Sequence, residues 1–326
     1  MTGAIASGAA VVAEVVRGGF VESAHLGHVV ALCADGRVSG ALGDPDVEVF
    51  ARSSLKPLQA VAMLRSGLDL DGELLALACA SHSGEPFHLD GVRRILASAG
   101  LDESALQNTP DFPYDDDERV RWRCAGRPKA SVAQNCSGKH AGMLATCVAA
   151  GWDPATYRDP DHPLQQAVRH VVHKLTGGPV EHVSVDGCGA PLFSCSLVGL
   201  ARAFATLATA DAGTPAGRVA AAIRAHPRWL GGTSRDVTQL IEGVDGLIAK
   251  DGAEGVYAAA LPDGRAVALK ILDGGDRPRP VVLAAALRGL GVDAPVLDDV
   301  AHVAVLGHGE PVGEVRAVPL ADVERP

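Results

Sequence analysis

The chain has 326 residues, which is too long for a small disulfide-stapled domain and allows one large domain or two ordinary ones. Hydrophobic residues make up 47% and charged residues 21% of the sequence, so a largely disordered chain is excluded. The formal net charge of -10, without a strong basic run, argues against a surface for nucleic acid or anionic membranes.

The first residues lack the positively charged region of a signal peptide, and Glu14 and Arg17 interrupt the apolar stretch that follows. No window approaches the roughly 20 uninterrupted apolar residues of a membrane helix. Seven cysteines are an odd count for a disulfide framework, and several lie in apolar segments. We therefore expect a cytoplasmic protein with reduced, mostly buried thiols.

The N-terminal part predicts strands followed by helices. Residues 10–16 and 28–33 are apolar and β-branched, which is typical of strands in a hairpin or meander. Pro57 can occupy only the first turn of a helix, so the next predicted helix begins near Ser53. A second helix is expected over residues 89–99.

A polar segment, residues 108–129, follows these helices. It carries several prolines and the acidic run from Asp115 to Glu118. This composition predicts a long surface loop, either a lid or a solvated loop without a role.

The rest of the chain predicts further helices and then strands. Helical spacing covers residues 140–150, 163–175, 192–208 and 280–290. Strands are expected at residues 246–250, 255–261, 265–271 and 312–318. The predicted fold class is therefore α/β (α+β), with strands in 8–50 and 244–320 sharing one antiparallel sheet and a helical region, 53–235, against it. That order makes residues 1–326 a single interwoven catalytic domain.

Ser53 and Lys56 have S-x-x-K spacing at a predicted helix start. Residues three apart lie on one helix face, so the amine can reach the hydroxyl. A desolvated, neutral lysine could take the serine proton and create a nucleophile. The alternative is a serine N-cap beside an exposed lysine.

Lys250 and Gly252 form a Lys-x-Gly sequence at the end of a predicted strand. A β-lactamase-like fold places such a strand beside a Ser-x-x-Lys helix at its active site. Gly252 would then let a substrate lie close to the strand edge. An ordinary turn is the alternative.

Small and polar residues follow an apolar run at residues 80–85. Ser81 could act as a second nucleophile, and His82 or Glu85 could bind a substrate ammonium or carboxylate. A helix C-terminus ending in a simple turn would give the same pattern.

Two cysteine-containing segments form the fourth candidate site. Cys136 lies near Lys139 and His140, and Cys188 follows in a glycine-rich stretch. There is no C-x-x-C pair, so neither segment is a standard zinc motif. The cysteines could still converge with His140 or with Lys139, which must lose its proton to bind a metal. Glycine-rich turns without a metal are the alternative.

Taken together, these strings resemble one family. The motifs are R-S-S-L-K-P (52–57), A-S-H-S-G-E (80–85), N-C-S-G-K-H-A-G-M (135–143), V-D-G-C-G (185–189) and A-K-D-G-A-E-G (249–255). In this order they resemble the Rhizobium etli-type, class 3 bacterial L-asparaginases, over about residues 8–320. The N-C-S-G-K-H-A-G-M string is the most specific of them. Asp251 departs from the pattern, since the wider fold usually has a threonine-like residue there.

The resemblance implies a glutaminase and serine β-lactamase-like fold, a homodimer, and hydrolysis of L-asparagine to L-aspartate and ammonia. Its two Ser-Lys pairs correspond to Ser53 with Lys56 and Ser81 with Lys250. Its metal, usually zinc, corresponds to Cys136, Lys139 and Cys188. Three of the chain's six lysines therefore stand at positions that the resemblance makes functional.

These residues predict an acyl-enzyme mechanism in which a serine attacks the side-chain amide, with Ser53 favoured as the nucleophile. Arg52 is expected to bind the substrate carboxylate, and the ammonium candidates are His82, Glu85 and Asp186. The alternatives are a broader amidohydrolase (glutaminase or β-lactamase-like) and an inactive metal-binding homologue.

Overall fold

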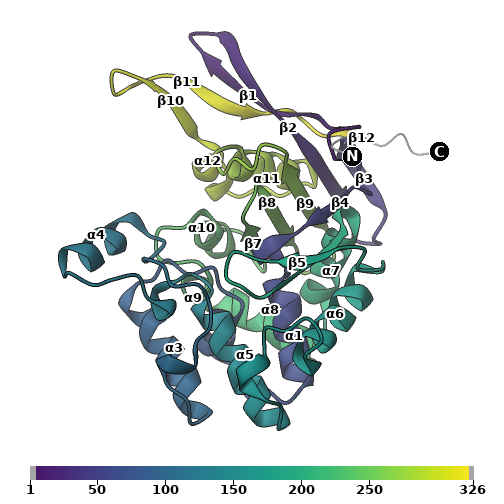
Figure 1. Ribbon diagram of the computed structural model, residues 1–326. Coiled ribbons are helices and arrows are strands. Elements are labelled where there is room, and N and C mark those ends of the chain that lie inside the picture. Colours follow the sequence, from purple (N-terminus) through teal and green to yellow (C-terminus); the bar gives the residue numbers. More distant parts are fainter. Residues whose placement is uncertain (1–4, 323–326) are drawn as a thin grey trace.

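The computed structural model describes residues 5–322 and is built around a nine-stranded sheet (Figure 1). The strand order is β10-β11-β1-β2-β9-β8-β7, and β3 pairs with β2 and β12. These strands are β1 (Ala10–Arg17), β2 (Phe20–Leu32), β3 (Val38–Leu42), β7 (Ile248–Gly252), β8 (Val256–Ala260), β9 (Ala266–Ile271), β10 (Val303–Gly307), β11 (Glu310–Ala317) and β12 (Ala321–Asp322). The predicted antiparallel sheet shared by the two ends of the chain is confirmed.

The two ends of the chain meet where β2 pairs with β9. The register places Val29 opposite Leu269 and Ala31 opposite Val267. All six residues of β9 are buried, and two helices, α7 (Leu197–Thr209) and α11 (Pro278–Gly289), contact the strand. This central part of the sheet is therefore covered on both faces, which explains why β8 and the first four residues of β9 are continuous apolar runs rather than alternating ones.

The helical region lies below this sheet in Figure 1. A short 3₁₀ turn, η1 (Arg52–Leu55), leads into the first long helix. The helices are α1 (Lys56–Arg65), α2 (Gly72–Ala78), α3 (Pro86–Ser98), α4 (Asp116–Cys124), α5 (Ser137–Ala150), α6 (Pro163–Thr176), α8 (Pro215–Ala225), α9 (Pro227–Leu230) and α10 (Asp236–Gly243), with α12 (Val296–Ala301) beside α11. The helix-rich middle of the chain is thus confirmed.

Two boundaries differ from the sequence prediction because a second, three-stranded sheet forms. It consists of β4 (Glu48–Phe50), β6 (Pro191–Ser196) and β5 (Val183–Val185). Residues 48–50 therefore leave the main sheet. The predicted helix over 192–208 begins only at Leu197, where Ser196 caps it by accepting a hydrogen bond from the Gly199 amide. The apolar run before it is a buried strand, which periodicity alone does not separate from a buried helix.

Residues 108–129 are not one long loop, because helix α4 forms inside them. The Asp115 side chain caps α4 by accepting a hydrogen bond from the Glu118 amide. Acidic residues occupy its first turn, whereas Arg121 and Arg123 occupy the last, as the helix dipole favours. Trp122 is its single buried residue, so the helix carries almost no apolar periodicity to detect.

Among residues 5–322, no helix has both the length and the apolar character needed to cross a membrane. All seven cysteines are unpaired, and five of them are buried, as the sequence predicted for most of them.

Candidate active site

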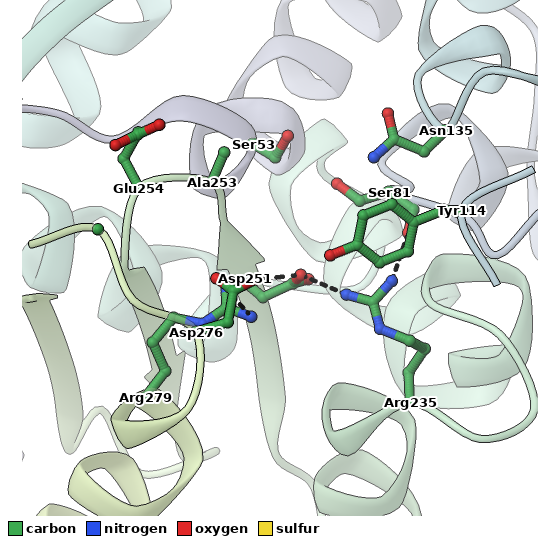
Figure 2. Close-up of a pocket in the computed structure, with 11 residues that line it drawn as sticks. Ser53, Ser81, Tyr114, Asn135, Arg235, Asp251, Ala253, Glu254, Asp276 and Arg279 are labelled. Carbon is green, nitrogen blue, oxygen red and sulfur yellow. Dashed lines mark hydrogen bonds and ion pairs between the residues drawn. The ribbon is translucent and has the colours of Figure 1, made fainter. Parts of the chain in front are cut away.

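A cavity of about 260 Å³ lies where strand β7 meets the helical region (Figure 2). Its lining is almost entirely polar and charged, and comprises Ser53, Ser81, Tyr114, Asn135, Arg235, Asp251, Ala253, Glu254, Gly274, Asp276 and Arg279. Pockets for drug-sized ligands usually measure about 300–1,000 Å³ and are mostly apolar. This cavity therefore suits a small polar molecule.

Ser53 reaches the cavity from η1, which packs directly on β7. The Ser54 hydroxyl donates to the Lys250 carbonyl over 2.9 Å. A Cβ on Gly252 would lie 2.7 Å from the Ala51 carbonyl oxygen, so only glycine permits this approach. The sequence interpretation gave Gly252 the role of admitting substrate. In the structure it admits the serine-bearing turn.

The Ser81 hydroxyl accepts a hydrogen bond from a lysine amine. The Lys56 amine donates to Ser81 Oγ over 3.0 Å and to the Ala80 carbonyl over 2.5 Å, and both Lys56 and Ser81 are buried. The resemblance paired Lys56 with Ser53 and Lys250 with Ser81. The structure brings Lys56 onto Ser81, because α1 directs the amine toward the turn that follows α2.

Lys250 lies on β7 and is completely buried. Its amine donates to Asp251 Oδ1 over 2.5 Å and to the Asp251 carbonyl over 2.7 Å. Burial disfavours the ammonium and lowers the pKa of Lys250 to about 8, although Asp251 opposes this shift. Burial alone would raise the pKa of Asp251, but Lys250, Arg235 and Arg279 hold it well below its usual value.

Arg52 and Asp186 form an ion pair. Arg52 Nε and Nη2 lie 2.9 and 2.8 Å from Asp186 Oδ1, and Glu254 is 3.9 Å from Arg52 Nη1. Arg52 has a φ of +52°, a strained conformation of the kind that clusters at functional sites. The sequence predicted that the Arg52 guanidinium binds the substrate carboxylate. In the structure it is paired with Asp186, which the sequence predicted as a substrate-binding residue too.

His82 and Glu85 do not line the cavity. His82 is completely buried, its Nε2 lies 2.8 Å from Ser137 Oγ, and its ring stacks on His88. Burial holds the pKa of His82 well below its ordinary value. The Glu85 carboxylate accepts hydrogen bonds from the amide and hydroxyl of Thr233. Both side chains fix the turn that carries Ser81.

The predicted metal ligands converge in a second cluster, Cys136, Lys139 and Cys188, all buried. Lys139 Nζ lies 3.1 Å from Cys188 Sγ. A hydrogen bond from Cys136 lowers the pKa of Cys188 to about 5 despite burial, and it raises that of Cys136 to about 12. Within residues 5–322 no three His, Cys, Asp or Glu side chains form a metal-binding group, so a metal here needs the lysine. Thiol sulfurs are ligands that zinc binds well, and the lysine amine could join them only after it loses its proton.

The cysteine cluster and the cavity are joined through the start of α5. Asn135 lines the cavity, and its Oδ1 accepts a hydrogen bond from Cys136 Sγ over 3.3 Å. A Cβ on Gly138 would lie 2.3 Å from the Leu77 carbonyl oxygen, so this glycine lets α5 approach the end of α2. The most specific string of the sequence therefore connects the two sites.

Sequence reasoning missed several residues of the cavity wall. Arg235 and Arg279 come from segments without a motif, and Tyr114 comes from the polar segment interpreted as a loop. Asn135 stood inside a motif but received no role. The charge of the two arginines was visible, but no spacing rule brings these four separate segments to one cavity.

Comparisons with solved structures give weak similarities. Mglu has 15% identity and a TM-score of 0.43, over 80% of this chain and 65% of Mglu, so the chain spans less than two thirds of that protein. A β-lactamase (Mb2281c) from Mycobacterium bovis has 15% identity and a TM-score of 0.46, over 82% and 95% of the two chains. A putative β-lactamase from Bacteroides dorei has 14% identity and a TM-score of 0.46, over 81% and 92%. No match was found among curated proteins.

A family model gives the decisive match, because it covers nearly the whole chain. The model described as L-asparaginase II matches residues 13–317. This range includes every predicted catalytic and metal-binding residue: Ser53, Lys56, Ser81, Cys136, Lys139, Cys188 and Lys250. The chain belongs to the L-asparaginase II family.

Proposed function

We propose that this protein is an L-asparagine amidohydrolase that releases L-aspartate and ammonia through an acyl-enzyme. The observation that carries the proposal is the contact between a buried lysine amine, Lys56, and the Ser81 hydroxyl at the wall of a small polar cavity. A nucleophile within hydrogen-bond reach of its base is the arrangement that covalent amide hydrolysis requires. Family membership supports the same chemistry.

In the proposed reaction the neutral Lys56 amine accepts the Ser81 proton while Ser81 Oγ bonds to the amide carbon. The Lys56 ammonium then protonates the leaving nitrogen, the C–N bond breaks and ammonia departs. Water attacks the acyl-enzyme, gives a proton to Lys56, and the C–Oγ bond breaks with return of a proton to Ser81. The sequence favoured Ser53 as the nucleophile. This assignment makes Ser81 the nucleophile instead, because Lys56 contacts its hydroxyl.

Ser53, Asn135 and Lys250 complete the proposed machinery. The Ser81 amide donates to the Leu230 carbonyl, so it is not free to bind an oxyanion. The Ser53 hydroxyl and the Asn135 side-chain amide are the donors in the cavity wall suited to that task. Lys250, with a pKa of about 8, is a second amine that exchanges protons near neutral pH.

The charged groups of asparagine need fixed partners at the mouth of the cavity. The Arg52–Asp186 pair is retained as the proposed anchor for carboxylate and ammonium, with Glu254 beside it. His82 and Glu85 serve the substrate indirectly in this proposal, by holding the Ser81 turn.

Zinc is proposed at Cys136, Lys139 and Cys188, as the family resemblance implies. When bound, the ion would add positive charge beside Asp186 and replace the proton on Lys139. Because Cys136 would give up its thiol proton to bind the ion, Asn135 would then be kept in position by the hydrogen bond that its Oδ1 accepts from Gln134 Nε2 over 3.2 Å and by the packing of α5. A homodimer and a cytoplasmic location remain proposals of the same kind.

Ammonia release from L-asparagine, with L-glutamine alongside, tests the proposal. Release from asparagine alone supports an asparaginase, and comparable release from both supports the broader amidohydrolase. Hydrolysis of a chromogenic cephalosporin would favour β-lactamase-like chemistry. No release from either amide, with zinc supplied, contradicts the proposal and leaves an inactive metal-binding homologue.

A further inference from the structure

Arg235 contacts three parts of the cavity at once. It precedes α10, and its side chain is only 13% exposed. Nη2 donates to Asp251 Oδ2 over 2.6 Å, and Nη1 donates to the Ser81 carbonyl over 3.3 Å. The guanidinium also lies 4.6 Å from the centre of the Tyr114 ring (Figure 2). One side chain thus joins β7, the Ser81 turn and the segment before α4.

The two oxygens of Asp251 have different partners. Oδ1 accepts from Lys250, whereas Oδ2 accepts from Arg235 and lies 4.0 Å from Arg279 Nη1. A carboxylate rotates easily about its last bond, so its orientation depends on what holds the second oxygen. The planar fork of Arg235, stacked on Tyr114, supplies that hold.

Arg235 also competes with Lys250 for the charge of Asp251. The charged and titratable groups facing Lys250 are Asp251 on β7, Lys56 on α1, Cys79 after α2 and Arg235 before α10. Those facing Asp251 also include Arg279 on α11, Asp236 on α10 and Tyr257 on β8. Asp251 favours the ammonium form of Lys250, and Arg235 opposes it. Loss of Arg235 therefore leaves more of the carboxylate charge to Lys250, because Arg279 lies 4.0 Å from Asp251 Oδ2.

We propose that Arg235 is a positioning residue: it holds the second oxygen of Asp251, so that this carboxylate does not turn its full charge onto the Lys250 amine, and it holds the Ser81 turn against β7. This inference rests on the proposed function of Lys250 in proton exchange. It also explains how an aspartate can follow this lysine, because Arg235 and Arg279 balance the added negative charge.

The test compares Arg235→Gln and Arg235→Lys with the matched control Arg228→Gln, an exposed arginine that pairs with Glu242 outside the cavity. Two readouts are used: the pH profile of kcat/KM for L-asparagine, and the NMR titration of lysines labelled at Cε. The chain has six lysines, and the Lys250→Arg variant identifies the Lys250 signal.

In Arg235→Gln we expect the Lys250 titration midpoint to rise by about one pH unit. We expect kcat at pH 7 to fall at least about tenfold and to recover as the pH rises, because a smaller share of Lys250 is neutral at pH 7. Arg235→Lys keeps the charge without the fork, so its midpoint should move less while kcat still falls. If Arg235→Gln does not fold, Arg235→Lys replaces it in the test. The expected result is then a fall in kcat together with a small shift in the Lys250 titration midpoint.

A Lys250 midpoint that moves no further than in the Arg228→Gln control overturns the inference. If the wild type hydrolyses neither amide but the midpoint rises in Arg235→Gln, the proposed function fails and the positioning role stands. If the wild type is active and neither the midpoint nor the pH profile moves, the positioning role fails and the proposed function stands.

Discussion

Two buried lysines, Lys250 and Lys139, show how differently the same side chain behaves behind the cavity wall and in the cysteine cluster. Both are at most 1% exposed, and burial alone would lower the pKa of each. Lys250 follows burial, because Arg235 and Lys56 counter its one carboxylate partner. The pKa of Lys139 is instead raised by Cys188, Cys136 and Asp186. Burial acts on both amines in the same direction, so the balance of neighbouring charge decides which of them loses its proton more readily.

The comparison also suggests different roles for the two regions: catalysis at the cavity, and stability and metal binding at the cysteine cluster. The cavity offers hydroxyls and an amine that can exchange protons, which are the requirements of acyl transfer. The cysteine cluster offers two thiol sulfurs and a lysine amine, with Lys139 Nζ 3.1 Å from Cys188 Sγ, and it adjoins the cavity through Asn135. We therefore expect changes in the two regions to affect different measurements: turnover in the first, stability and metal content in the second.

The largest expected effect comes from the cavity serines. Ser81→Ala should lower kcat by at least about 1,000-fold, because it removes the proposed nucleophile. Ser53→Ala should lower kcat by about 100-fold, the size expected for losing one oxyanion donor. Ammonia release measures both, and mass spectrometry of quenched wild-type enzyme locates the acyl group. An acyl group on Ser53 would reverse the two roles and restore the assignment favoured by the sequence.

Replacing Lys139 should lower the free energy of unfolding much more than replacing Lys250. Lys139→Met should destabilise the zinc-free protein by about 3 kcal/mol, because it leaves the Cys188 thiolate buried without its cation. Lys250→Met should change stability by less than about 1 kcal/mol, since Arg235 still pairs with Asp251, yet it should abolish most activity. Urea unfolding measures the first effect and ammonia release the second. Equal destabilisation by both substitutions would contradict the comparison.

The pH dependence of the free energy of unfolding should reveal the lowered pKa of Lys250. Its folded pKa of about 8 lies below the ordinary lysine value of 10.5, so the unfolded chain binds more protons between these values. The free energy of unfolding should therefore rise between pH 8 and 10.5, by on the order of 3 kcal/mol at most. Below pH 8 the amine is protonated in both the folded and the unfolded chain, so this lysine should make no further contribution to the pH dependence. The measurement is the difference between wild type and Lys250→Met in urea unfolding across this range, and a flat difference would refute the lowered pKa.

Metal content should depend on the cysteine cluster alone. We expect one zinc per chain in the purified wild type, and loss of that zinc in Cys188→Ala. The exposed Cys124 provides the matched control, since Cys124→Ala should keep the metal. Elemental analysis measures both. Zinc that persists in Cys188→Ala would place the metal elsewhere.

The smallest expected effect is at α4. Asp115→Ala removes the cap of this helix and should cost about 1 kcal/mol of local stability, with a change in KM below about threefold. Hydrogen exchange of residues 116–124 measures the first, and asparagine kinetics measure the second. Asp116→Ala, an exposed first-turn residue outside the cap bond, is the control. A larger change in KM would give α4 a direct part in substrate binding.

The sequence by itself determined the sheet shared by both ends of the chain, the helical middle, and the two serines and two cysteines that are proposed for the site. These rested on local signals: β-branched runs such as residues 28–33, a proline at a helix start, and motifs of fixed spacing. Such signals depend on neighbours along the chain, which is why α4, with one buried residue, escaped them.

Only the tertiary structure decided which lysine meets which serine and what surrounds each amine. Ser53 and Lys56 are close in sequence, yet Lys56 contacts Ser81, which is 25 residues away. Arg235 reaches Asp251 from outside every motif. Electrostatic and hydrogen-bond energies depend on distance in space and on burial, and neither can be read from spacing along the chain.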